Sequence, residues 1–548
     1  MEEISSVSVI LRRNIFSRRT EKTFNFTESA GFRGKAVDLD WIVFRVGLLS
    51  VLYSKYKKAT VGVMITASHN PEPDNGVKVV GPMGEMMEGS WELSATELIN
   101  SRDEDLELTL QQTINNFCID ATWPASVYFA RDTRPSSPML AEALCKALEM
   151  FHCTVKDYGI LSTPQLHYMV RCDNTHGSYG VPTEAGYYEK LSKAFLAIMQ
   201  PESNKGQYIA SVMIDGANGV GALKAADISK YLKHSLSMSI FNDGSHGKLN
   251  YKCGADHVKV SQTAPEGVPV ELAARCLSFD GDADRVVYYY IDEGGKFSLL
   301  DGDKIATLVA GFLNEMVVAS GLNLKLGVVQ TAYANGSSTN YISNVLKVPV
   351  SCVSTGVKHL HHRAADYDVG VYFEANGHGT VLFSDKAFNM IRKISNAESG
   401  DTCQKEAADK LLSFVDVVNQ TVGDAISDML LVEAILHERG WSIQQWNDLY
   451  NDLPNRQMKV KVRERTVIVT TDAERKTTAP AGLQDRIDEI VSKYPVARAF
   501  VRPSGTEDIV RVYAESDTQE KADSLACKVA QAVYDMAGGD GDRPAELC

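Results

Sequence analysis

The sequence of 548 residues lacks several features that would place it in a specialised class of protein. No apolar run approaches 18 residues, so no transmembrane helix is expected. None of the ten cysteines forms a Cys-x-x-Cys pair, which argues against a zinc ribbon and, in so long a chain, against a disulfide scaffold. We therefore expect reduced thiols in a cytoplasmic protein.

The chain also has no excess of positive charge. It carries 56 Lys and Arg against 70 Asp and Glu, a formal net charge of −14. An acidic surface disfavours binding to nucleic acid or to an anionic membrane, and an anionic substrate would need a local basic site. The first 25 residues contain four arginines but also three acids and no long apolar stretch, which argues against a signal peptide and leaves a mitochondrial presequence as a weaker alternative. The arginines are Arg12, Arg13, Arg18 and Arg19, and the acids are Glu2, Glu3 and Glu21.

Strand-like and helix-like segments alternate through most of the chain, which is typical of α/β layers. The clearest predicted strands are residues 60–66, 154–159, 211–214 and 326–330. Residues 173–207 are polar and rich in turn formers, and we interpret them as a connector with a short helical stretch. After residue 453, two helical stripes and two strands predict an antiparallel sheet with helices on one face.

The strongest local signal is the acidic motif Phe279-Asp-Gly-Asp-Ala-Asp-Arg285, which precedes a predicted strand. In an extended loop the alternate residues Asp280, Asp282 and Asp284 would point to one side. Three such carboxylates favour a hard cation such as Mg²⁺. A calcium loop of the EF-hand type would need Gly and Glu at positions that hold Arg285 and Ile291. A solvated acidic turn is the alternative.

A second motif, Thr66-Ala-Ser-His-Asn-Pro71, follows an apolar strand. A hydroxyl such as that of Ser68 on a loop after a strand is well placed for nucleophilic chemistry. The motif is not the Gly-x-Ser-x-Gly elbow of hydrolases, and a plain turn explains it equally well. Downstream, a turn at residues 74–77 is followed by Lys78, a cation that could meet a phosphate.

Two further segments have the composition of ligand-binding turns. Arg502-Pro-Ser-Gly-Thr506 offers backbone N–H groups, hydroxyls and a guanidinium that suit a phosphate, with Arg511 on the next strand. In residues 371–379, Glu374 and Asn376 could bond to sugar hydroxyls beside glycines that permit close approach. A hairpin turn and a polar turn are the respective alternatives.

Two more cations lie at the ends of predicted elements. Arg131 ends a strand in Arg131-Asp-Thr-Arg134, and Lys358 begins a helix. A helix start attracts phosphate and a lysine adds a point charge there, although either cation could belong to a surface pair.

The motifs at residues 66–71, 279–285, 371–379 and 502–506 follow one another along the chain in the order found in the α-D-phosphohexomutase superfamily, and they resemble the motifs of that superfamily. Asn376 stands where glucose and mannose phosphate mutases usually carry Ser, so the chain is most similar to the branch that acts on N-acetylglucosamine phosphates. The similarity covers roughly residues 30–540. One segment departs from it, because Glu28-Ser29 replace a Gly-Thr pair just before Arg33.

The resemblance implies an α/β protein of four domains around a central cleft, with three mixed α/β sandwich domains and a smaller C-terminal α+β domain. The expected domains are 1–190 with the phosphoserine, 191–299 with the metal, 300–452 with the sugar site and 453–548 with the phosphate site.

The resemblance also implies the roles of individual residues. Ser68 would be the phosphoserine and would hold Mg²⁺ together with Asp280, Asp282 and Asp284. The sugar and the phosphate that is not reacting would contact Glu374, Ala375, Asn376, Arg502, Pro503, Ser504, Gly505, Thr506 and Arg511. The candidates for proton transfer or charge neutralisation are His69, Lys78, Arg33, Arg131, Arg285 and Lys358.

We therefore expect an isomerase, a monomer, that moves phosphate between O6 and O1 of N-acetylglucosamine for nucleotide-sugar synthesis. Its partner would be a small sugar phosphate, with no nucleic acid and no membrane. Two alternatives remain, the same reaction on glucose or mannose phosphates and a homologue that binds sugar phosphates without activity.

Overall fold

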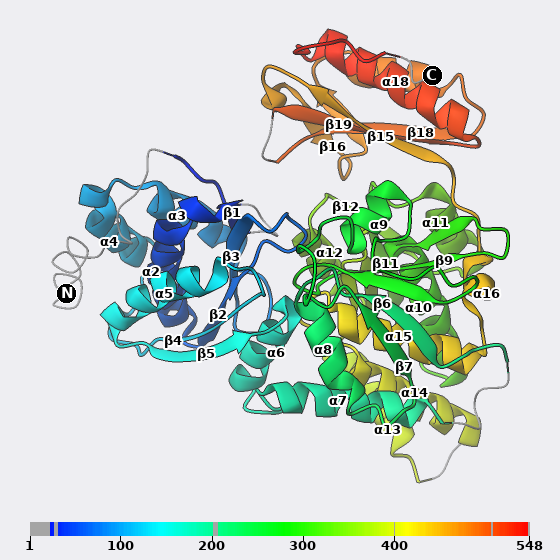
Figure 1. Cartoon of the computed structure of the whole chain (residues 1–548), viewed down its shortest axis with the longest axis horizontal. Helices are drawn as coiled ribbons and strands as arrows, with labels where there is room; N and C mark the ends of the chain where they lie inside the picture. The colour runs from blue at the N-terminus through cyan, green and yellow to red at the C-terminus, as the bar shows by residue number, and fades with distance from the viewer. Residues whose placement is uncertain (1–21, 27–30, 201–205, 399–400, 506–507, 546–548) are drawn as a thin grey trace. The chain divides into compact units, whose positions relative to one another are not determined.

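Figure 1 presents a computed structural model that describes residues 22–26, 31–200, 206–398, 401–505 and 508–545. The atypical segment at residues 28–29 lies outside the described residues. The chain forms two compact units. The first comprises Met1–Gly302, Asn376–Thr380 and Asp409–Ile443, and the second comprises the remainder.

The first unit contains two five-stranded sheets. The first sheet has the order β1-β3-β2-β4-β5, in which β2, β4 and β5 are parallel and β1, β3 and β2 are joined antiparallel. Its strands are β1 (Phe32–Lys35), β2 (Thr60–Ile65), β3 (Asp74–Val80), β4 (Ser126–Arg131) and β5 (Thr154–Ile160). Every residue of β2 is buried, as expected for a central strand covered on both faces.

Helices around this sheet supply most of its core. They are α2 (Asp40–Lys57), α3 (Gly89–Asn100), α4 (Leu106–Asn116) and α5 (Ser137–Leu148). Helix α6 (Thr163–Asn174) contacts β2 and β4, and α7 (Glu184–Ile198) follows it along the chain. Helix α2 is apolar on all sides and almost wholly buried, and it packs so closely on α5 that a Cβ at Gly47 would lie 2.6 Å from the Ala147 Cβ.

The prediction of a connector with a short helical stretch at residues 173–207 is wrong about the length of the helix. Residues 184–198 form the 15-residue helix α7, which packs against α15 (Ala425–Arg439). Its apolar face is interrupted by glycine and tyrosine, and the distant partner that buries it is not visible in the local sequence.

The second sheet has the order β10-β9-β8-β6-β7. Its strands and helices are β6 (Ser211–Asp215), α8 (Val220–Ser229), β7 (Ser237–Phe241), α9 (Ala255–Ser261), β8 (Cys276–Phe279), β9 (Val286–Ile291) and β10 (Phe297–Leu300). Helix α15 also belongs to this unit. A buried ion pair between Arg275 and Glu433, at 2.8 Å, joins the sheet to it.

The second unit contains a sheet of order β12-β11-β13-β14 and a C-terminal sheet of order β15-β19-β18. The first group of elements is α10 (Gly302–Ala319), β11 (Leu326–Thr331), α11 (Gly336–Asn340), β12 (Val350–Val353), α12 (Val357–Ala364), β13 (Val369–Phe373), β14 (Gly379–Phe383), α13 (Asp385–Ser395) and α16 (Ile443–Asn447). Helix α14 (Thr402–Val417) begins in the second unit and continues into the first, which resumes at Asp409.

The C-terminal elements match the predicted antiparallel sheet with helices on one face. They are β15 (Asn455–Lys461), β16 (Val469–Thr471), β17 (Lys476–Ala479), α17 (Leu483–Val491), β18 (Ala497–Pro503), β19 (Ile509–Ser516) and α18 (Gln519–Met536). In Figure 1, α18 lies along one face of this sheet. No helix in the described part of the chain combines the length and the apolar character that a membrane crossing requires.

Candidate active site

Three carboxylates meet in the turn between the antiparallel strands β8 and β9. One oxygen from each of Asp280, Asp282 and Asp284 lies within 4.8 Å of the others. The predicted convergence is present, but the predicted extended loop is wrong, because the chain makes a tight turn with Ala283 at φ +58°. Asp280 Oδ1 stabilises this turn by accepting hydrogen bonds from the N–H groups of Asp284 and Arg285 at 3.1 and 3.2 Å.

The three carboxylates are buried, with 1%, 0% and 5% of Asp280, Asp282 and Asp284 exposed. Burial, together with the negative charges of Asp284 and Asp282, raises the pKa of Asp280 well above its ordinary value. Among the described residues, Asp282 Oδ1 and Asp284 Oδ1 accept no hydrogen bond. Buried oxygens of this kind are costly unless a cation meets them, so an all-oxygen donor set fits Mg²⁺.

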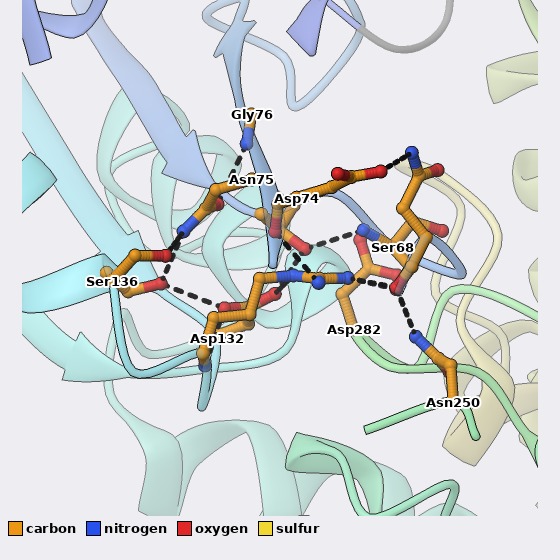
Figure 2. Close-up of polar contacts among 12 residues, drawn as sticks. Ser68, Asp74, Asn75, Gly76, Asp132, Ser136, Asn250 and Asp282 are labelled. Carbon is orange, nitrogen blue, oxygen red and sulfur yellow. Dashed lines mark hydrogen bonds and ion pairs between the residues drawn. The ribbon is translucent and has the colours of Figure 1, made fainter. Parts of the chain in front are cut away.

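Ser68 lies beside these carboxylates, on the loop that follows β2. Its Oγ donates a hydrogen bond of 2.7 Å to Asp280 Oδ2, and its side chain is almost wholly buried. Figure 2 shows Ser68 and Asp282 on facing loops. A Cβ added to Gly281 would lie 2.5 Å from the Ser68 carbonyl oxygen, so the close approach of the two loops requires glycine there.

Four predicted cationic or imidazole side chains gather at the same place. Lys78 Nζ lies 3.2 Å from Asp282 Oδ2 and 3.3 Å from Asp284 Oδ2. Arg285 Nε lies 3.8 Å from carboxylate oxygens of Asp280 and Asp284. The turn predicted before Lys78 is wrong, because residues 74–80 form strand β3, whose pairing with β2 brings Lys78 to the cluster.

His69 and Arg33 complete this group. His69 Nδ1 lies 3.4 Å from Ser68 Oγ, and the positive charge of Arg285, burial and the positive charge of Arg33 lower the pKa of His69 to about 2. The imidazole is therefore neutral at neutral pH. Arg33 Nη1 lies 3.4 Å from Asn70 Oδ1, and burial lowers the pKa of Arg33 although Asp282 opposes this shift.

The structure places Arg131 differently from the other candidates. Its guanidinium pairs with Asp157 on β5 at 3.3 Å. The arginine that reaches the Ser68 loop is Arg134, three residues further along, which is wholly buried and donates to the Ser68 carbonyl at 2.8 Å. The sequence places Arg134 at the end of the Arg131-Asp-Thr-Arg134 motif but gives no sign of these contacts.

Two other contacts of the acidic turn were missed. Thr163, at the start of α6, donates from Oγ1 to Asp282 Oδ2 at 2.6 Å. His378 Nδ1 lies 3.5 Å from Asp284 Oδ1, and the Gly377 carbonyl accepts a hydrogen bond of 3.2 Å from the Val286 N–H. The tail of the predicted sugar-binding turn therefore contacts the acidic turn.

The remaining sugar-site candidates follow strand β13. Glu374 and Ala375 come directly after the strand, and Asn376 Oδ1 accepts a hydrogen bond of 2.9 Å from the His378 N–H. Lys358 lies in the first turn of α12, as predicted. Glu374, Ala375 and Lys358 belong to the second unit, and Asn376 belongs to the first.

Strand pairing in the C-terminal sheet places three cations in a row. Arg511 on β19 is opposite Arg502 on β18 and Lys459 on β15. Their neighbours Val512 and Val501 belong to the core under the helices, so the row lies on the other face of the sheet. Like charges directly opposite one another repel, and an anion between them would remove this cost. Lys459 was not among the predicted site residues, because its place opposite Arg511 follows only from the strand register.

The turn after β18 is partly described. Ser504 is buried and its N–H donates to the Ile509 carbonyl at 2.9 Å, while the Gly505 carbonyl accepts from Arg465 at 3.2 Å. Thr506 lies outside the described residues.

One cation of this row, Arg502, already forms an ion pair with a carboxylate. Glu474 Oε1 lies 3.1 Å from Arg502 Nε, and Glu474 Oε2 accepts from the Thr355 N–H at 2.9 Å. An anion is thus stable at this position, as the phosphate prediction for Arg502 requires.

Comparison with known proteins gives this geometry its context. Family models of phosphoacetylglucosamine mutase AMG1, domain II and domain III, match residues 178–287 and 301–441. The model of the phosphoglucomutase/phosphomannomutase α/β/α domain I matches residues 35–106 and 107–185. The model of the phosphoglucomutase/phosphomannomutase C-terminal domain matches residues 458–532. A relative from Homo sapiens, named phosphoacetylglucosamine mutase, is 54% identical over 94% of this chain and 95% of its own length. The chain belongs to the phosphoacetylglucosamine mutase family.

Solved structures agree with this membership. The Aspergillus fumigatus N-acetylphosphoglucosamine mutase in complex with GlcNAc-6P and magnesium is 47% identical, with a TM-score of 0.92 over 98% of this chain and 99% of that one. A serine-to-alanine variant of the A. fumigatus enzyme in complex with glucose 1,6-bisphosphate has a TM-score of 0.91. The predicted fold class and superfamily are confirmed, and the chain is a mutase, a kind of isomerase.

Within the phosphoacetylglucosamine mutase family, the described geometry has the components of phosphoryl transfer. A buried hydroxyl, three carboxylates that could hold a cation, three cationic side chains and a neutral imidazole lie in the first unit. The row of cations on the C-terminal sheet lies in the second unit. Charge neutralisation and positioning are the two requirements of such a reaction.

Proposed function

We propose that this chain interconverts N-acetylglucosamine 6-phosphate and N-acetylglucosamine 1-phosphate, with Mg²⁺ as cofactor. A phosphoserine at Ser68 and a sugar 1,6-bisphosphate would carry the phosphoryl group. The observation that carries the proposal is the 2.7 Å contact between Ser68 Oγ and Asp280 inside a buried carboxylate cluster, in a member of this family.

In the first half-reaction, phospho-Ser68 transfers its phosphoryl group to the free hydroxyl of the sugar phosphate. The bond from phosphorus to Ser68 Oγ breaks, a bond to the sugar oxygen forms, and the hydroxyl proton leaves to a base. The bisphosphate then turns around, and its other phosphate returns to Ser68 by the reverse chemistry. Proton transfer and charge neutralisation are assigned to the group His69, Lys78, Arg33, Arg131, Arg285 and Lys358.

The carboxylates of Asp280, Asp282 and Asp284, with the Ser68 phosphate, would hold the cation. When bound, Mg²⁺ neutralises charge on the transferring phosphoryl group. Lys78 and Arg285 each face two of these carboxylates, so they also neutralise negative charge in the cluster.

The two ends of the substrate need different groups. The sugar hydroxyls are assigned to Glu374, Ala375 and Asn376. The phosphate that is not reacting is assigned to the turn Arg502-Pro503-Ser504-Gly505-Thr506 with Arg511, and the opposite pairing of Arg502 and Arg511 supports this assignment. A cytoplasmic monomer remains our expectation.

A coupled assay with bisphosphate primer tests the proposal. We expect turnover of N-acetylglucosamine phosphates to exceed that of glucose and mannose phosphates. Ser68→Ala should abolish it, whereas Ser229→Ala, at an exposed hydroxyl at the end of α8, should leave it unchanged. Activity of Ser68→Ala within about tenfold of the parent would remove the phosphoserine mechanism.

A further inference from the structure

Arg134 makes an unusual set of contacts to the backbone of the Ser68 loop. Its Nη2 donates to the carbonyls of Ser68 and Asn70 at 2.8 and 2.9 Å. Its Nη1 donates to the carbonyls of Pro71 and Asp74 at 2.8 and 3.0 Å. The side chain is wholly buried, so one guanidinium fixes the carbonyls along the whole loop from the nucleophile to the start of β3.

The charge of Arg134 is balanced by Asp132, which also reaches the loop. Arg134 Nε donates to Asp132 Oδ2 at 3.0 Å, and the Thr66 hydroxyl donates to the same carboxylate oxygen at 2.8 Å. The Ser68 N–H in turn donates to Thr66 Oγ1 at 3.0 Å. The buried pair therefore constrains Ser68 from both sides, through its N–H and through its carbonyl.

A second element supports the same carbonyls. Asn250 Nδ2 donates to the carbonyls of Ser68 and Asn70 at 2.8 and 3.0 Å. Ser68 itself has φ +52°, a left-handed conformation that a residue with a Cβ adopts only when its surroundings impose it. The contacts of Arg134 and Asn250 supply that constraint.

We propose that Arg134 is a positioning residue for phosphoryl transfer, which holds Ser68 in one orientation in both its free and its phosphorylated form. This inference rests on the proposed function, because it takes Ser68 as the residue that carries phosphate. The reaction uses the Ser68 oxygen twice, once to give and once to recover a phosphoryl group, so a displaced loop would impair both half-reactions. A lysine at position 134 would keep the charge but could not reach four carbonyls, because it lacks the planar fork.

The chain offers a matched control. Arg45 is also wholly buried, and it donates to the carbonyls of Ile99 and Ser101 at 2.8 and 2.7 Å and pairs with Asp103 at 2.7 Å. These partners lie at the end of α3 and in the segment that follows it, not in the Ser68 loop. Arg45→Lys should therefore lower the Tm as Arg134→Lys does, without altering the chemistry.

The experiment compares Arg134→Lys, Arg45→Lys and the parent by Tm, steady-state kinetics and intact mass after incubation with bisphosphate. We expect kcat of Arg134→Lys to fall by about 100-fold with KM within about threefold, since small misplacements cost rate more than binding. We also expect its phosphorylated fraction to fall, and both readouts to stay near the parent value in Arg45→Lys. Equal kcat and equal phosphorylation in the two variants would overturn the proposal.

Two further variants keep the test decisive. If Arg134→Lys does not fold, Asn250→Ala removes the second donor to the same carbonyls. A loss of kcat with little change in KM would then support the proposal, and an unchanged kcat would overturn it. Ser68→Ala separates the two claims, because turnover in that variant contradicts the proposed function itself, whereas a phosphorylated and fully active Arg134→Lys contradicts only the positioning role.

Discussion

Asp282 shows how one side chain can link the cation site to the fold around it. Its Oδ2 accepts from Thr163 Oγ1 and pairs with Lys78, while its Oδ1 has no hydrogen bond within the described residues. The free oxygen is the one available to a cation, and the occupied oxygen fixes the orientation of the carboxylate. The spacing of the acidic motif could be read from the sequence, but the different contacts of the two Asp282 oxygens could not.

Asp282→Asn should therefore impair the cation site more than substrate binding. The amide keeps the shape of the side chain but removes the negative charge that a hard cation needs. We expect the Mg²⁺ concentration for half-maximal rate to rise at least tenfold and kcat to fall at least 100-fold, with a smaller change in sugar-phosphate affinity. Titration of activity with Mg²⁺ and direct binding of substrate measure both effects.

Asp292 provides the control for this test. Asp292→Asn, in the turn between β9 and β10, removes a carboxylate of the same sheet that accepts only local backbone N–H groups. It should leave the Mg²⁺ dependence unchanged. If Asp282→Asn behaved like Asp292→Asn, the cation would have to be placed elsewhere.

At the scale of elements, strand register explains what single motifs cannot. Arg502 and Arg511 were expected to act together because they flank one turn, and their direct pairing across β18 and β19 gives the reason. Lys459 joins them only because β15 pairs with β19 in this register. The contacts of Thr163 and His378 with the acidic turn were not predicted for the same reason, since each residue comes from a distant segment of the chain.

Arg511→Ala should weaken binding of N-acetylglucosamine 6-phosphate and N-acetylglucosamine 1-phosphate by similar factors. One cation row that holds either phosphate in turn requires this even effect. A charged hydrogen bond contributes about 1.5–3 kcal/mol, so KM should rise roughly 10- to 150-fold in each direction. Arg543→Ala, at an exposed arginine after α18, provides the control. An effect on one direction alone would imply two separate phosphate sites.

A buried histidine makes the stability of the first unit depend on pH. Burial lowers the pKa of His167 to about 4, and its Nδ1 lies 2.7 Å from the Gly84 carbonyl oxygen. In the unfolded chain a histidine titrates near pH 6.5, so between pH 6.5 and pH 4 the unfolded state binds a proton that the folded state does not. The free energy of unfolding should therefore decrease as pH falls through this window.

The pH dependence can be assigned by substitution. Over about 2.5 pH units this single group accounts for roughly 3 kcal/mol. His167→Gln removes the titrating group, so denaturation with urea at pH 6.5, 5.5 and 4.5 should show a shallower decline than in the parent. His176→Gln, at an exposed site after α6, should retain the parental decline. Parallel curves for the parent and His167→Gln would contradict the assignment to His167.

For the whole molecule, the net charge is −14, whereas the C-terminal sheet carries a local row of cations. The acidic composition led us to expect a local basic site for an anionic substrate, and the cation row on the C-terminal sheet fits that expectation. The alternation of apolar runs and turn formers was sufficient to predict the α/β class. The helix at residues 184–198 was underestimated because its partner α15 lies more than 200 residues away, and the role of Arg134 depends on a loop that the local sequence does not show.

The central claim is that the Ser68 oxygen gives its phosphoryl group to the sugar and then recovers one. The direct measurement is a single turnover of protein carrying an isotopically labelled phosphate on Ser68, mixed with unlabelled N-acetylglucosamine 6-phosphate and Mg²⁺. The account requires the label to leave the protein at the rate of product formation and to appear in the bisphosphate and then in N-acetylglucosamine 1-phosphate. Product that forms while the label stays on Ser68 would contradict the account.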